Sequence, residues 1–133
     1  MTTATAPRSP LDIERIFVVL VAIHSFAIGI ALLAIPEWGA RIGGFGHLEP
    51  LFFARQGGAF HVVVAIGYVM EHLRHRTMTL LLLAKCLAVV FLVTTSVTCP
   101  VPWVVPLSAA GDGLMALAAL VIRRWCARAA SPP

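Results

Sequence analysis

Residues 78–97 read MTLLLLAKCLAVVFLVTTSV, and this stretch decides the fold class of the chain. Its only charged residue is Lys85. A bilayer core about 30 Å thick is crossed by roughly 20 predominantly apolar residues in a helix. The stretch is therefore expected to cross a membrane as an α-helix.

Three other windows have the same character, at residues 16–35, 51–70 and 103–122. The first is longer than the apolar region of a signal peptide and ends at Ile35-Pro36-Glu37 without a cleavage site of small residues, so we interpret it as a retained helix. The sequence predicts an all-α integral membrane protein, an up-down bundle of four transmembrane helices.

The remaining segments are short. The chain is expected to form a single transmembrane domain over residues 1–133, with flexible tails at 1–10 and 129–133, which are rich in Thr, Ala, Ser and Pro. Residues 37–50 hold four glycines and are expected to form a loop along the outer surface.

The composition excludes other classes of protein. Of the 133 residues 59% are hydrophobic and 12% are charged, and the mean hydropathy is +0.92, which is too apolar for a soluble domain. The net charge is +4, but the basic residues lie mostly at the ends of apolar runs, so no nucleic-acid partner is expected. Three cysteines are too few for a disulfide framework. No nucleotide-binding, zinc-protease or nucleophile motif is present, and no stand-alone catalytic activity is expected.

Orientation follows from the positive-inside rule, under which short cytoplasmic loops are rich in arginine and lysine. One side of the predicted bundle has only Arg41 and Arg55, and Lys85 lies within a span. The other side has Arg8, Arg15, Arg74, Arg76, Arg123, Arg124 and Arg128. Both termini are therefore expected in the cytoplasm.

Each predicted span carries one ionisable residue near the middle of the bilayer. Counting from the nearest cytoplasmic anchor places these residues roughly 13–17 Å deep. They are His24, His61, Lys85 and Asp112. Small residues share their helical faces, as Ala27, Ala31 and Ala34 do with His24, so the four are expected to point into the bundle. Because a lone Lys or Asp there costs about 2.5–3.5 kcal/mol, Lys85 and Asp112 are expected to pair. The two histidines would complete a hydrogen-bonded cluster or a small water-filled cavity.

Three uses of this polar centre stay open. The ion pair and the histidines can serve only to fix helix order, since buried polar residues hold transmembrane helices together. His24 and His61, at equal depth on different helices, can instead ligate a haem b. Asp112, Lys85 and the histidines can also relay protons, as in a small transporter or a proton-conducting homo-oligomer.

A second candidate region lies where the second span begins. There Arg55-Gln56-Gly57-Gly58 combines a cation with glycines that permit close approach. Arg55, Gln56, His47 and Trp38 are candidate contacts for the headgroup of a lipid or a quinone near the outer leaflet. The alternative is an Arg55 that only extends to the lipid phosphates.

Two further patterns have simpler interpretations. His72 and His75 have a spacing that can place both rings on one helical face for a metal, with Glu71 nearby. Two adjacent arginines favour a solvated helix end instead, and no metal site is expected. Cys86 is expected to be a buried small apolar residue.

In layout, the chain resembles the small bacterial DoxX-like membrane proteins, which are four-helix proteins of comparable length. The resemblance covers about residues 15–122 and depends on the spans and on Arg55-Gln56-Gly57-Gly58. It implies a bacterial inner-membrane protein associated with quinone-linked or redox-related complexes. We therefore expect an accessory or anchor subunit whose partners are membrane lipids and either copies of itself or other membrane subunits.

Overall fold

The computed structural model describes residues 10–130, and within them the chain forms five α-helices and no strand. The helices are α1 (Pro10–Ala34), α2 (Pro36–Ile42), α3 (Phe52–His75), α4 (Thr79–Thr98) and α5 (Val104–Ala130). The all-helical fold predicted from the sequence is confirmed. At the edges of the two predicted tails, Pro10 begins α1, and Ala129 and Ala130 belong to α5. The rest of both predicted tails, residues 1–9 and 131–133, lies outside the described residues.

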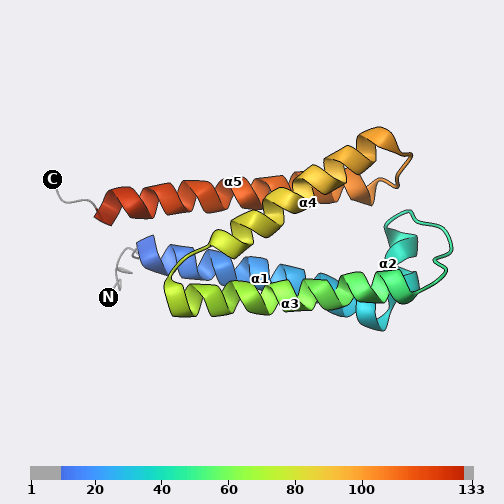
Figure 1. Ribbon diagram of the computed structural model, residues 1–133, viewed down its shortest axis with the longest axis horizontal. Helices are drawn as coiled ribbons and strands as arrows, with labels where there is room; N and C mark the ends of the chain where they lie inside the picture. Colours follow the sequence, from blue (N-terminus) through green and yellow to red (C-terminus); the bar gives the residue numbers. More distant parts are fainter. Residues whose placement is uncertain (1–9, 131–133) are drawn as a thin grey trace, which may run out of the picture.

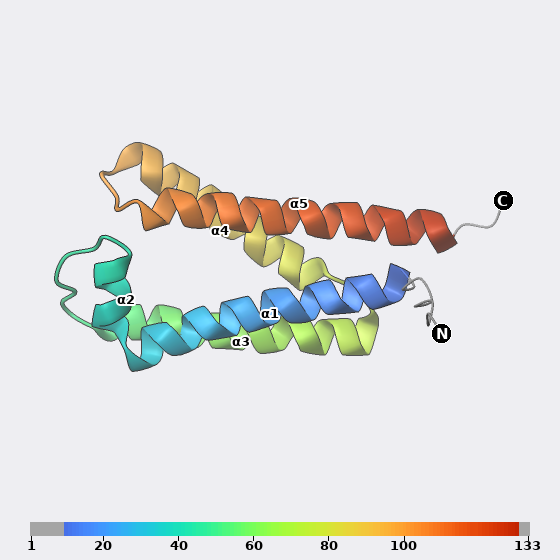
Figure 2. The ribbon, with the colours of Figure 1, turned by 180° about the vertical axis from the view of Figure 1, so that it is seen from behind.

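The four long helices run alternately up and down. Figure 1 shows α1 and α3 side by side, with α4 crossing obliquely in front of α5. The start of α1 and the end of α5 lie at the same end of the bundle as the α3–α4 turn, and α2 lies at the opposite end with the α4–α5 loop; Figure 2 shows the same arrangement from behind. The topology therefore places the arginine-rich segments at one end of the molecule and the segments with few basic residues at the other end.

Three of the helices are long and apolar enough to cross a membrane. They are α1 over Asp12–Ala34, α4 over Thr79–Thr98 and α5 over Val104–Ala129. α3 has 24 residues and is about 36 Å long, but it contains charged residues, histidines and glycines and falls below the apolarity of the other three. The first, third and fourth predicted spans thus correspond to membrane-compatible helices, and the count of four is not established.

Apolar side chains cover the outside of the bundle. Among the large ones, Phe53 is 68% exposed, Phe91 67% and Val97 81%. The buried core lies mainly toward the end that bears the termini, and consists of Val18, Val21, Ala22, Tyr68, Met78, Leu81 and Ala119. An apolar surface this extensive is compatible with a small membrane protein, because lipid covers such side chains at no cost.

The closest helix packing is between α1 and α3. A Cβ atom on Gly58 would lie 2.7 Å from the carbonyl oxygen of Gly29, and one on Gly29 would lie 2.8 Å from the carbonyl oxygen of Gly58. Glycine at both positions therefore lets the two backbones touch, as small residues do between transmembrane helices. α4 packs mainly on α5, α1 also contacts α5, and α3 contacts α4 only slightly.

The prediction that residues 37–50 form only a loop is wrong, because α2 occupies the first part of this segment. Pro36 stands at the first turn, where a missing N–H is tolerated and the fixed φ favours a helix. The helix ends at Ile42 with Gly43 as its C-cap, and Gly44 has φ +83°, a conformation that glycine adopts readily. A Cβ on Gly44 would meet the Trp103 ring at 2.9 Å, so this turn packs closely against the start of α5.

Candidate functional site

A buried ion pair lies between α4 and α5. Lys85 Nζ donates a hydrogen bond of 2.5 Å to Asp112 Oδ1, and the side chains are only 5% and 16% exposed. The pairing expected from the depths of the two residues is therefore present. Removing one member of a buried pair is strongly destabilising, since the other charge is left without a partner.

The pair lines a partly open cavity of about 170 Å³ to which all four long helices contribute side chains. The lining residues are Ser25, Phe60, His61, Val64, Tyr68, Ala84, Lys85, Ala88 and Asp112. Ser25 Oγ and His61 Nδ1 are buried and have no hydrogen-bond partner among the described residues. Buried polar atoms normally have partners, so this cavity offers unused hydrogen-bonding capacity.

His24 does not line this cavity, although it is near enough to His61 to interact with it electrostatically. Its side chain is exposed, as is that of Ala27. The buried face of α1 is instead formed by Val18, Val21, Ala22, Ser25 and Gly29. One residue along a helix turns the side chain by about 100°, which moves Ser25 into the bundle and His24 out of it.

This rotation also bears on the haem hypothesis. Two axial ligands must face one space, but His61 lines the cavity while His24 lies on an exposed face of α1. This cavity therefore does not hold both histidines as the axial ligands of a haem. Within the part of the chain that the structure describes, no group of three or more His, Cys, Asp or Glu side chains is arranged to hold a metal ion.

A second buried polar cluster, missed from the sequence, lies at the end that bears the termini. Glu14 on α1 is 7% exposed, His72 on α3 is 3% exposed, and His72 Nδ1 lies 3.6 Å from Glu14 Oε1. The Cys126 side chain on α5 is hydrogen-bonded to Glu14. The interpretation of His72 as part of a solvated helix end is therefore wrong, whereas His75 is exposed as expected.

Glu71 joins α3 to α4. Its Oε1 accepts hydrogen bonds from Thr77 Oγ1 at 2.7 Å and from the Thr79 backbone N–H at 3.1 Å, and its Oε2 accepts one from the Leu80 N–H at 2.9 Å. The carboxylate thus caps the first turn of α4, which has no cap from its own N-cap residue, Met78. Partial burial raises the pKa of Glu71, but these hydrogen bonds outweigh it and hold the pKa below its ordinary value.

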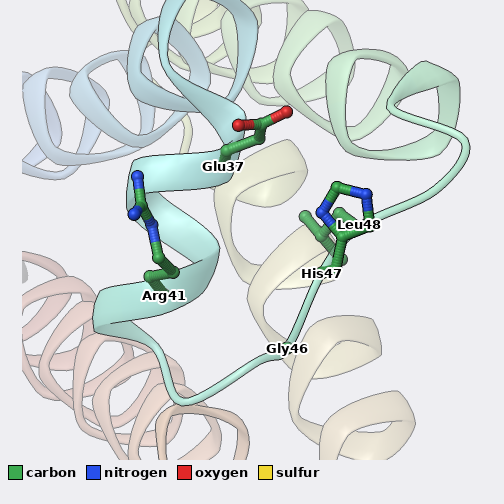
Figure 3. A pocket seen from close by; sticks show the side chains of 5 residues that line it. All are labelled: Glu37, Arg41, Gly46, His47 and Leu48. Carbon is green, nitrogen blue, oxygen red and sulfur yellow. The ribbon is translucent and has the colours of Figure 1, made fainter.

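The predicted headgroup region is only partly assembled. Trp38 and Arg55 line one hollow of about 300 Å³ beside α2, together with Arg41, which the sequence analysis did not select. His47 lines a neighbouring cavity of about 220 Å³ and forms an exposed pair with Glu49 at 2.9 Å. Figure 3 shows this cavity between α2 and the following loop. Gln56 lines neither.

The cysteines form no disulfide within the described residues. Cys86 is exposed on α4, so the expectation of a buried position is wrong. It follows Lys85 directly, and the helical turn that buries Lys85 carries Cys86 to the outer face.

Helical spacing could have identified the residues that were missed. Ala22, Ser25 and Gly29 repeat at intervals of three and four, and Glu14 and Val18 continue the same stripe. On α3, Tyr68 and His72 continue a stripe from His61 in the same way. On α1 the alanines beside His24 form another stripe of small residues that could also face the bundle. Only the packing of α1 against α3 and α5 shows which of the two stripes is buried.

Comparison of the chain with known protein families, with curated proteins and with solved structures finds no match.

Proposed function

We propose that α3 is a fourth membrane span, so that all four long helices cross the bilayer with both termini in the cytoplasm. α3 is as long as its neighbours and runs antiparallel to α1 beside it. Its polar groups His61 and His72 are directed toward the cavity and toward Glu14 rather than outward. The arginines of the α3–α4 turn and of the C-terminal part of α5 lie at the end of the bundle that we assign to the cytoplasm.

Membrane-impermeant thiol reagents test this topology. In a chain whose native cysteines are replaced by alanine, Gly46→Cys and His75→Cys place reactive thiols beyond the two ends of α3; position 46 has room for a side chain and His75 is exposed. The two thiols should react from opposite sides of sealed vesicles. Reaction of both from the same side would contradict a fourth span.

Within this topology, the central cavity supports a binding function. We propose that the protein is an accessory membrane subunit that binds the polar head of a lipid-soluble molecule of the quinone class. The observation that carries this proposal is the cavity itself, in which Ser25 Oγ and His61 Nδ1 have no partner among the described residues. Tyr68 and Lys85 add O–H and N–H donors, which suit the two carbonyl oxygens of a quinone ring.

The size and edge of the cavity suit such a ligand. At about 170 Å³ it is smaller than the pockets that enclose whole ligands, so it would hold a ring while an apolar tail lies outside. Phe60, Ala84 and Ala88 lie on α3 and α4, two long helices that contact each other only slightly. A ligand would enter there from the lipid.

Lipid extraction of the purified protein followed by quinone analysis tests this function, together with binding of a short-chain quinone. Ser25→Ala and Tyr68→Phe should each weaken binding by about tenfold, the effect of one lost hydrogen bond of about 1.4 kcal/mol. Ser108→Ala, on an exposed position of α5, is the control. Absence of quinone from wild-type protein, together with no binding of the added quinone, would contradict the proposal.

A small transporter or proton-conducting protein is the second candidate, and a specific row of side chains favours it. Glu14 and His72 pair near the end of the bundle, and Tyr68 lies one turn from His72 on α3 and lines the cavity. These groups are buried between that end and Lys85–Asp112, and the His72 ring nitrogens have no hydrogen-bond partner among the described residues, so they are open to a proton. If it conducts, proteoliposomes should dissipate a pH gradient faster than protein-free vesicles, and His72→Phe should abolish the difference while His75→Phe should not. An equal rate with and without protein would exclude conduction.

We propose that the exposed face of α1 around His24 is covered by another membrane helix, from a second copy of the chain. A histidine facing lipid at mid-bilayer is costly, and the nearby Ala27 permits close approach of helices. A dimer in mild detergent that dissociates in His24→Leu would support this interface. A monomeric wild-type protein would contradict it.

The DoxX-like relationship and a bacterial inner-membrane location are part of the same proposal. They are supported by the arrangement of four long helices and by Arg55-Gln56-Gly57-Gly58 at the start of α3.

A further inference from the structure

A hollow of about 300 Å³ lies where α1 ends, α2 begins and α3 starts. It combines cationic and apolar side chains. Arg41 comes from α2 and Arg55 from the first turn of α3, so two elements separated by a loop each contribute an arginine to one site. The other lining residues are Ala34, Ile35, Pro36, Glu37, Trp38 and Leu51. A site with both characters suits a ligand that is charged at one end and apolar at the other.

The charge of this hollow favours an anion. Two arginines and one glutamate give a formal charge of +1, and neither Arg41 nor Arg55 forms an ion pair among residues 10–130. Figure 3 shows the Glu37 carboxylate and the Arg41 guanidinium extending from different sides of α2, with the carboxylate toward His47. The two guanidinium groups are therefore available to an incoming anion.

We propose that this hollow binds the phosphate headgroup of an anionic amphiphile, with Arg41 and Arg55 contacting the phosphate oxygens. The guanidinium fork matches phosphate geometry and can donate two parallel hydrogen bonds. Trp38 is 56% exposed at the rim, where an indole suits the boundary between headgroups and acyl chains. The proposal rests on the four-span topology only for placing the site at the outer leaflet, and it is independent of what occupies the central cavity.

Native mass spectrometry of the purified protein with phosphatidylglycerol or with phosphatidylcholine tests this site. The wild type should retain the anionic lipid in preference to the neutral one, and the double variant Arg41→Gln, Arg55→Gln should lose this preference by about tenfold. The matched control is Arg74→Gln, Arg124→Gln, which removes the same charge from exposed positions at the other end of the bundle. Arg41→Lys, Arg55→Lys keeps the charge but not the fork, and should bind with intermediate affinity.

Inorganic phosphate distinguishes a lipid from a free anion. If inorganic phosphate displaces phosphatidylglycerol, the anion alone is sufficient for binding. If phosphatidylglycerol stays bound in excess phosphate, the apolar residues of the hollow contribute to binding. Both results support a phosphate site at Arg41 and Arg55. Equal losses in the two double Gln variants, or equal retention of both lipids by the wild type, would overturn it. Quinone binding in the same variants is the independent readout and should be unchanged, so that failure here leaves the proposed function testable.

Discussion

Lys85 on α4 and Asp112 on α5 form a hydrogen-bonded ion pair, 2.5 Å from Nζ to Oδ1, at the wall of the central cavity. The pair joins two helices, and its side chains are only 5% and 16% exposed. It places a cationic and an anionic group side by side in the lining of the cavity.

Breaking this pair should be costly, and removing both charges should be less so. Lys85→Met is expected to lower the free energy of unfolding by about 3–5 kcal/mol, because Asp112 is left buried and unpaired. Adding Asp112→Asn should restore part of the loss. Unfolding by titration with a denaturing detergent measures both, and Cys86→Ala, at the neighbouring exposed position, is the control. Additive effects of the two substitutions would mean that the pair is not coupled.

The contact between α1 and α3 makes a separate prediction. Gly58→Ala would place a Cβ 2.7 Å from the Gly29 carbonyl oxygen, so the helices must separate at a cost of about 1–3 kcal/mol. Gly57→Ala is a matched control, since no atom lies within 4 Å of its added Cβ. Detergent unfolding should show loss of stability in the first variant and none in the second. Equal stability of the two would contradict this backbone contact.

The sequence predicted the helical fold, the antiparallel order of the long helices and the pairing of Lys85 with Asp112. These predictions follow from the length of each apolar run and from the position of each ionisable residue along its helix, and both can be determined for one helix at a time. The rotation of a helix about its axis depends on its neighbours, and on α1 it is Ser25 rather than His24 that lines the cavity. Helical spacing places Glu14 and His72 on stripes that can face the bundle, but no local pattern shows that these two residues contact each other across α1 and α3.

Stability should depend on the charge of Glu71 in acid. Its pKa is lowered in the folded protein, so its contribution is present above the unfolded pKa of about 4.5 and is lost as the pH falls through the lower folded value. Glu71→Ala should lower the free energy of unfolding at neutral pH by about 0.5–2 kcal/mol, as loss of a helix cap does.

The pH dependence below about 4.5 should be weaker in Glu71→Ala than in the wild type. Unfolding measured at several pH values checks both effects, with Glu37→Ala, exposed on α2, as the control. An unchanged acid profile in Glu71→Ala would contradict the capping role.

The most direct test of the proposed function fills the cavity without altering its charges. Ala88 lines the cavity on α4, whereas Ala110 is exposed on α5. Quinone bound per chain should be measured in purified wild-type, Ala88→Leu and Ala110→Leu proteins. We predict that the wild type and Ala110→Leu retain quinone, and that Ala88→Leu loses it while remaining folded. Retention of quinone by folded Ala88→Leu at the wild-type level would contradict binding in this cavity.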